Sequence, residues 1–89
     1  MGDKNNVVAA TADLLVKTGH GIIKAIYVTQ AGDRIFTIRD GIAAGGGDAL
    51  FAIDTSDLVL MPYINHPVNA GLFADSDAGT TGTLLIVYE

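Results

Sequence analysis

The sequence predicts an all-β protein, a small antiparallel β-sandwich of jelly-roll type with about seven or eight short strands. Runs rich in Val, Ile, Thr, Tyr and Phe recur along the whole chain, and these residue types are enriched in strands. Turns rich in Gly and Asp separate the runs at spacings of about 8–12 residues. No segment shows a convincing helical period, so a sandwich or jelly roll is the expected architecture.

The clearest strand signal lies between Gly21 and Gly41, where two β-rich runs flank a short polar segment. Residues 22–29 and 35–39 form the runs, and residues 30–33 have the composition of a turn, so we predict a hairpin. Neither face of the first run is truly polar, which is typical of a strand that is covered on both sides or lies in a subunit interface. Alternation places Ile22, Lys24, Ile26 and Val28 on one face, and Ile23, Ala25, Tyr27 and Thr29 on the other.

The N-terminal part divides into a polar lead-in and the start of the domain. Residues 1–6 are expected to be a flexible segment, followed by a single β-sandwich domain over residues 7–89. Residues 7–18 fit either one amphipathic helix, with Asp13 as a cap, or two short strands. We favour the strands, because Val and Thr are frequent in this segment and are β-branched.

The C-terminal half continues the strand pattern beyond a glycine-rich loop at residues 41–47. Residues 49–54 alternate as a strand does, and residues 58–61 form a short apolar run that Pro62 ends or limits to an edge. A second proline makes residues 63–68 irregular. Strands are then expected at residues 71–75 and 83–89, the last lying inside a sheet.

The composition predicts that copies of this chain associate. Apolar residues make up 49% of the 89 residues before 11 glycines are added, and charged residues make up only 17%, against about 25% in typical domains. A domain of this size buries only about 60–65% of its surface on folding, so we expect an obligate homo-oligomer. The alternative is an Ala- and Gly-rich monomer with scattered exposed aliphatic residues. The residues expected in the interface are Ile22, Lys24, Ile26, Val28, Leu58, Leu60 and Tyr63.

Charge and cysteine content exclude several classes of function. The net charge of -5 argues against nucleic-acid binding, which depends on cationic contacts. The chain has no cysteine, so neither a disulfide framework nor a thiolate metal site can form. No apolar run reaches the roughly 18 residues of a membrane span, and the first residues lack the pattern of a secretory signal.

Two segments partly match the sequence patterns of ligand-binding loops. Gly45–Gly47 could belong to a phosphate loop, but no Gly-Lys-Ser/Thr follows, so a flexible loop is the preferred interpretation. Residues 75–79 read D-x-D-x-G, which is typical of calcium loops, with Asp75 and Asp77 as ligands. The expected glycine position holds Thr80 and the bidentate glutamate position holds Ile86, so an acidic surface turn is the alternative.

Residue types that support catalysis are sparse. His20 and His66 are the only histidines and lack a clear third ligand for zinc, although a symmetry axis could bring copies of one histidine together. Ser56 and Ser76 lie in Asp-rich turns without a G-x-S-x-G context. We therefore predict a non-enzymatic protein with no catalytic residues, no cofactor and no metal.

Two segments carry a resemblance to a known group of proteins. Residues 69–89, NAGLFADSDAGTTGTLLIVYE, resemble the terminal pattern nGLyvd…sG…g.vtVvYe, and residues 37–41, TIRDG, resemble tl.iyDG. Both patterns belong to small virion proteins of tailed bacteriophages and related environmental sequences, such as capsid-decoration or fibre modules. This chain departs from the pattern at Arg39, where an aromatic residue is usual, and in residues 62–67.

The resemblance implies a structural virion protein that forms a homotrimer and docks on other virion proteins of a capsid or fibre. Such a protein is made in the host cytoplasm and resides in the virion. A carbohydrate-binding jelly-roll module is the alternative, although the chain has no Trp and only three Tyr and three Phe for stacking on sugars. An enzyme of cupin type would need a cluster of histidines and carboxylates, which two histidines do not supply.

Overall fold

A computed structural model describes residues 5–89, in which all regular structure is β-strand and no helix occurs. Since no helix occurs between Asn5 and Glu89, none there is long and apolar enough to cross a membrane. The strands are β1 (Asn6–Ala10), β2 (Leu14–Thr18), β3 (Gly21–Gln30), β4 (Ile35–Asp40), β5 (Asp48–Asp54), β6 (Leu60–Met61), β7 (His66–Val68), β8 (Gly71–Ser76) and β9 (Thr83–Tyr88).

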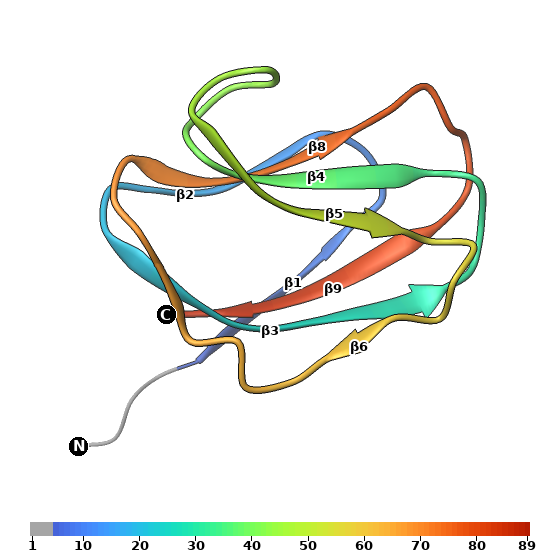
Figure 1. Ribbon diagram of the computed structural model, residues 1–89, viewed down its shortest axis with the longest axis horizontal. Coiled ribbons are helices and arrows are strands. Elements are labelled where there is room, and N and C mark those ends of the chain that lie inside the picture. Colours follow the sequence, from blue (N-terminus) through green and yellow to red (C-terminus); the bar gives the residue numbers. More distant parts are fainter. Residues whose placement is uncertain (1–4) are drawn as a thin grey trace.

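The strands form two antiparallel sheets that pack face to face, as Figure 1 shows. Sheet A has five strands in the order β1-β9-β3-β6, with β7 also pairing with β3, and sheet B has four strands in the order β2-β8-β4-β5. The predicted all-β sandwich is therefore confirmed. Strands β6 and β7 pair with the same neighbour, so together they occupy the place of one interrupted strand, and the fold becomes an eight-stranded jelly roll.

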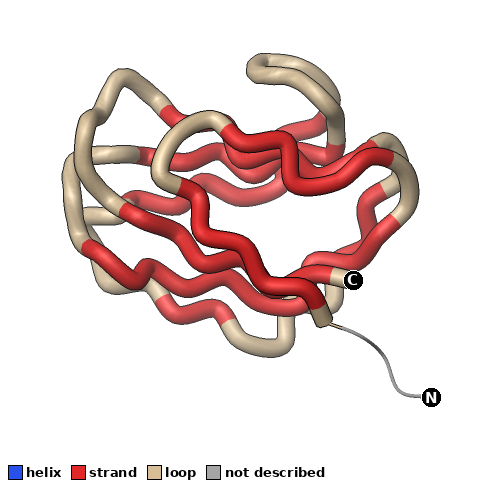
Figure 2. Tube along the Cα trace, turned by 180° about the vertical axis from the view of Figure 1, so that it is seen from behind, coloured by secondary structure: helices blue, strands red, loops and turns tan. Residues whose placement is uncertain are grey.

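The predicted hairpin between residues 21 and 41 is wrong, although both of its strands exist. Strand β3 lies in sheet A and pairs with β9, β6 and β7, whereas β4 lies in sheet B between β8 and β5. The connection crosses from one layer to the other at the right of Figure 1, and Figure 2 shows the two layers from behind. The two runs face each other across the core and do not share a ladder of hydrogen bonds.

Hydrogen bonds to residues distant in the sequence explain why residues 31–34 cross between the sheets. The Gly32 N–H donates to the Thr55 carbonyl at 3.2 Å, and the Arg34 N–H donates to the Thr81 carbonyl at 2.9 Å. The Asp33 carboxylate accepts the N–H groups of Thr80 and Thr81 at 2.9 and 2.8 Å. These bonds pair the Gly32 and Arg34 N–H groups and fix the loop to distant segments where the chain leaves sheet A.

The alternation predicted for the first run is also wrong beyond Ile23, because β3 contains a bulge. Its register with β9 shifts between Ile23 and Ala25, which leaves Lys24 as the extra residue. After the bulge the two faces exchange, so Ile23, Ile26 and Val28 point into the core. Ala25 and Tyr27 lie on the outer side of the sheet, where Ala25 is only 6% exposed. A single bulged residue is enough to move a side chain to the opposite face.

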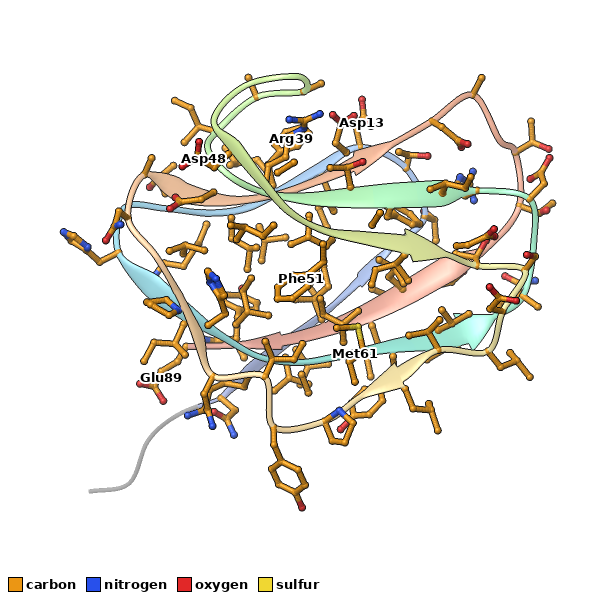
Figure 3. The ribbon with its side chains drawn as sticks, viewed as in Figure 1. Asp13, Arg39, Asp48, Phe51, Met61 and Glu89 are labelled. Carbon is orange, nitrogen blue, oxygen red and sulfur yellow. The ribbon has the colours of Figure 1, made fainter. Side chains whose placement is uncertain are left out.

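The core fills the space between the sheets with aliphatic and aromatic side chains from both layers. Sheet A contributes Ile26 and Ile86, and sheet B contributes Phe36 and Ile38, each with no exposed surface. Phe51 and Met61 pack against these residues, and Figure 3 shows both side chains between the two layers. Sheet separations of about 10 Å are filled by such interdigitating side chains.

The N-terminal predictions are partly confirmed. Residues 7–18 form two strands, β1 and β2, as favoured over a helix. The predicted flexible segment ends too late, because Asn6 already belongs to β1 and lies opposite Tyr88. The rest of that prediction falls on residues 1–4, outside the described part of the chain.

Candidate functional site

The outer face of sheet A is apolar, and we refer to it as the apolar face. Strand β9 buries Leu84 and Ile86 completely, so the intervening Leu85 and the following Val87 point away from the core. Antiparallel pairing places outward side chains of neighbouring strands side by side, which forms two rows across the sheet. The rows are Val7, Val87 and Ala25, and Ala9, Leu85, Tyr27 and Leu60.

Side chains at both margins of this face are open to solvent. Val7 in β1 exposes 59% of its surface and Leu60 in β6 exposes 67%. Large aliphatic side chains at such exposure are ordinary when they are single. Here they continue into rows of further apolar residues, which is the pattern of a surface that another molecule covers.

The outer face of sheet B has a different character. Arg39 and Asp75 form an ion pair there, with 2.8 Å between Nε and Oδ2, and Figure 3 shows Arg39 beneath the glycine-rich loop. Thr37 and Asp54 alternate with the inward-facing Phe36 and Ile53, so they add polar groups to the same surface. The outer face of sheet B therefore carries an ion pair and polar side chains beside exposed apolar ones such as Leu15 and Ile35, whereas the two rows on sheet A contain no charged residue.

A hollow of about 410 Å³ lies at one end of the apolar face. Its volume falls within the range of about 300–1,000 Å³ that is usual for ligand pockets. Its walls combine apolar and aromatic surface with amide groups and one ammonium group. They are formed by Asn5, Lys24, Ala25, Tyr27, Pro62, Tyr63, Asn65 and Val87.

Tyr63 stands at the edge of this hollow with 88% of its surface exposed. Its backbone has a φ of 60° and that of Asn65 has a φ of 50°, in the left-handed region that non-glycine residues rarely adopt. Asn tolerates this region better than a bulky residue such as Tyr does. Between them, the Ile64 N–H donates to the Lys24 carbonyl at 2.8 Å and holds the segment against β3.

Lys24, the bulged residue of β3, is the one charged side chain among those lining the hollow. Its Nζ lies 3.9 Å from Oε2 of Glu89, and both side chains are about a quarter to a third exposed. Glu89 lies at the chain end beside sheet A in Figure 3. The pair is long and partly solvated, so it contributes little to stability, but it balances charge at the edge of the apolar face.

The residues predicted for a subunit interface fall into two groups. Ile26 and Val28 are 0% and 5% exposed inside the core, so their prediction is wrong and the bulge at Lys24 is the reason. The others keep some accessible surface, and their role in an interface stays a prediction. They are Ile22, Lys24, Leu58, Leu60 and Tyr63.

The sequence reasoning missed most of the apolar face. Val7, Ala9, Leu85 and Val87 were not singled out, although Leu85 and Val87 lie at its centre and Val7 and Ala9 at its β1 margin. The signal was present in the C-terminal run TLLIVYE, where four apolar residues in succession leave no polar face for solvent. Such a run is typical of a strand covered on both sides.

The acidic turn at residues 75–79 uses its carboxylates within the protein. Asp75 accepts hydrogen bonds from Arg39 at 2.8 Å and from the Gly45 N–H at 3.0 Å. Asp77 accepts from the N–H groups of Ile35 at 3.1 Å and Gly79 at 2.9 Å. Between Asn5 and Glu89, no group of three or more His, Asp or Glu side chains is placed to hold a metal ion.

His66 and the two serines considered above have local partners, whereas His20 is exposed in the turn between β2 and β3. The His66 ring meets Phe51 edge to face, with 5.6 Å between centroids, and its Nδ1 lies 2.8 Å from the Pro67 carbonyl. The Ser56 hydroxyl donates to Asp54 at 2.7 Å and the Ser76 hydroxyl donates to the Asp77 carbonyl at 3.1 Å. Each of these contacts holds a turn or a strand end in place.

Asp40 stabilises the turn between β7 and β8. Its carboxylate accepts the N–H groups of Ala70 at 2.8 Å and Asn69 at 3.0 Å. The Ala70 bond is the main reason that the pKa of Asp40 lies below its ordinary value of 3.8, and the Asn69 bond adds to this, although burial opposes both. The pKa values of Asp33, Asp54 and Asp75 are lowered as well, chiefly by bonds from Thr81, Ser56 and Arg39 respectively.

We expect Asp40→Asn to lower the urea midpoint of unfolding at pH 7 and to leave the midpoint nearly unchanged in acid. A carboxylate whose pKa is lower in the folded state contributes stability above its unfolded pKa, and this is lost as the pH falls through the folded value. The difference in urea midpoint between the variant and the parent should therefore shrink below about pH 3.8, the ordinary pKa of an aspartate. Urea titrations at pH 7, 4.5 and 2.5 measure it.

The matched control is Asp57→Asn. The Asp57 side chain is exposed and accepts no hydrogen bond within the described residues, so the same substitution should leave the midpoint unchanged at pH 7. Equal shifts in the two variants would show that the bonds to Asn69 and Ala70 contribute nothing.

Comparisons with family models, with curated proteins and with solved structures produced no match to this chain. We therefore infer function from the apolar face, the hollow and the ion pair on the outer face of sheet B.

Proposed function

We propose that this protein is a non-enzymatic structural module that assembles with copies of itself through the apolar face. The observation that carries the proposal is the contrast between the two outer faces, with two uninterrupted apolar rows on sheet A and an Arg39–Asp75 ion pair on sheet B. Apolar surface contributes about 25 cal/mol for each Å² removed from water, so burial of these rows favours association.

The distribution of charge supports self-association through the same surface. Copies with a net charge of -5 repel one another, and the repulsion is least where few acidic groups approach. No Asp or Glu belongs to the two apolar rows, and at the hollow Lys24 lies opposite Glu89. Contact through the apolar face therefore brings together surfaces that are nearly neutral.

The assembly that we propose is a homotrimer in a bacteriophage virion, attached to other proteins of a capsid or fibre. This part of the proposal rests on the resemblance of residues 37–41 and 69–89 to small virion proteins. A trimer needs heterologous contacts, in which each copy presents two different surfaces to its neighbours. Many weak attachments of small modules to a repeating lattice are strengthened by avidity.

Light scattering coupled to size-exclusion chromatography tests self-association and the number of copies. We expect a mass of three times the 9.2 kDa of one chain at micromolar concentration. The mass should persist in 0.5 M salt, because apolar contacts are not screened as charges are. A single 9.2 kDa species that stays soluble at high concentration would overturn the proposal.

A carbohydrate-binding module is the second candidate, and the hollow is the observation that favours it. Tyr27 and Tyr63 could stack on a sugar ring, while Asn5, Asn65 and Lys24 could donate to its hydroxyl groups. This function requires the hollow to be open in the assembled protein. A glycan array probed with the parent protein and with Tyr63→Asn tests it, and binding that the substitution abolishes would support this candidate.

A further inference from the structure

We propose that Tyr63 is the anchor of the self-association, and that its ring enters the hollow of a neighbouring copy. Each copy then donates one tyrosine and receives one. This inference rests on the proposed function, since it names the contact that would hold neighbouring copies in register, with Tyr63 and the hollow as the two different patches that a heterologous contact requires. Tyr63 and the hollow lie on the same side of the sandwich, and the segment of residues 62–65 both carries Tyr63 and forms part of the hollow's wall.

The backbone presents Tyr63 to a partner in advance of binding. The side chain is 88% exposed, and its φ of 60° is an unfavourable conformation for a tyrosine. Such conformations persist where surrounding structure enforces them, and here the Ile64–Lys24 hydrogen bond fixes the backbone next to Tyr63 against β3. Only the two side-chain torsions of Tyr63 are left to order on binding, and tyrosines are frequent anchors of interfaces.

The hollow has the chemistry to receive a tyrosine ring. Tyr27 and Val87 offer apolar surface, and aromatic pairs in contact are favourable beyond the area that they bury. The Lys24 ammonium can lie over the face of an incoming ring as a cation–π contact. The side chains of Asn5 and Asn65 can bond the phenol hydroxyl, which needs a partner once it is buried.

Continuity with the rows of the apolar face favours a second copy as the occupant. Two lining residues, Tyr27 and Val87, are themselves members of the two rows, so a chain that covers the rows also covers the hollow. The residue that fills the hollow must therefore come from the same chain that covers the two rows. Tyr63, the most exposed of the large apolar and aromatic side chains between Asn5 and Glu89, lies on that chain's own face.

The absence of cysteine allows a direct test by disulfide trapping. Two full-length variants of different tagged mass, Tyr63→Cys and Ala25→Cys, are mixed, allowed to exchange subunits, and oxidised briefly. The inference predicts a disulfide-linked heterodimer as the main product, because position 25 lines the hollow that receives position 63. The matched control mixes Tyr63→Cys with Ala52→Cys, since Ala52 is exposed on the outer face of sheet B.

Equal yields from the two mixtures, or linkage only between two copies of Tyr63→Cys, would overturn the inference. Tyr63→Asn provides the second measurement, because Asn tolerates the left-handed backbone and the fold should be kept. We expect Tyr63→Asn to weaken association at least tenfold and Tyr63→Phe to weaken it less. If the parent assembles and Tyr63→Asn assembles equally well, the anchor is wrong while self-association stands. If the parent is monomeric, the proposed function itself fails.

Discussion

Replacing Ile86 with Ala is expected to lower the free energy of unfolding by about 2–5 kcal/mol. Ile86 is fully buried in the central strand β9, between Val8 of β1 and Ile26 of β3. The substitution removes apolar contacts and leaves a cavity that the surrounding sheets can close only in part. A domain of this size has a total stability at the lower end of about 5–15 kcal/mol, so a large share would be lost.

Urea unfolding followed by far-UV circular dichroism measures this loss, at one fixed protein concentration because the proposed association would contribute to stability. The matched control is Ile35→Ala, the same substitution at a side chain that is 42% exposed on sheet B. That variant should lose no more than about 0.5–1 kcal/mol. Similar losses at the two positions would contradict the assignment of Ile86 to the core.

Replacing Leu85 with Glu is expected to convert the assembly into folded single subunits. Leu85 is the direct neighbour of Ile86 in β9 but points outward, opposite Ala9 and Tyr27 in the middle of the apolar face. An unpaired carboxylate buried at an interface costs about 3–5 kcal/mol, which corresponds to a loss of affinity of more than about a hundredfold. The substitution also adds a negative charge to a protein whose net charge is already -5.

Light scattering measures the mass of the Leu85→Glu variant, and circular dichroism shows whether it is folded. Ala52→Glu is the matched control, because it adds the same charge to an exposed position of β5 on the opposite sheet. The control should keep the mass of the parent protein. If Leu85→Glu also keeps that mass, the apolar face is not the surface through which copies associate.

The strands themselves could be predicted from local composition. Residues 49–54 and 83–89 were recognised because β-branched and aromatic residues alternate or run together between turns, and both form strands. Pro62 was correctly expected to interrupt its run, and it separates β6 from β7. These features depend on φ restriction and side-chain shape within a few residues, so sequence patterns carry them.

Strand pairing could not be predicted in the same way. Residues 22–29 and 35–39 looked like a hairpin because a short polar segment joins them, yet β3 and β4 lie in different sheets. Gly32 and Asp33 bond to Thr55 and Thr81, more than twenty residues further along the chain. Bonds over such separations depend on the finished fold and leave no periodic signal in the sequence.

The candidate site, like the fold, could be predicted only in part from the sequence. The excess of apolar residues, readable from composition, predicted that some surface would be covered by another copy. Which side chains form that surface depends on the bulge at Lys24, which turns Ile26 inward and Tyr27 outward. The hollow joins residues from β3, from β9 and from the segment after β6, which only sheet pairing brings together.

By itself, the sequence determined that this protein is a small all-β sandwich whose composition leaves apolar surface in excess, because strand propensity, turn chemistry and hydrophobicity are properties of short segments. The tertiary structure alone decided the jelly-roll pairing, the side of β3 and β9 that faces outward, and the place of Tyr63 beside its hollow. The physical reason is that a β-sheet is built from contacts between distant segments, and a single bulge reverses which side chains each segment buries.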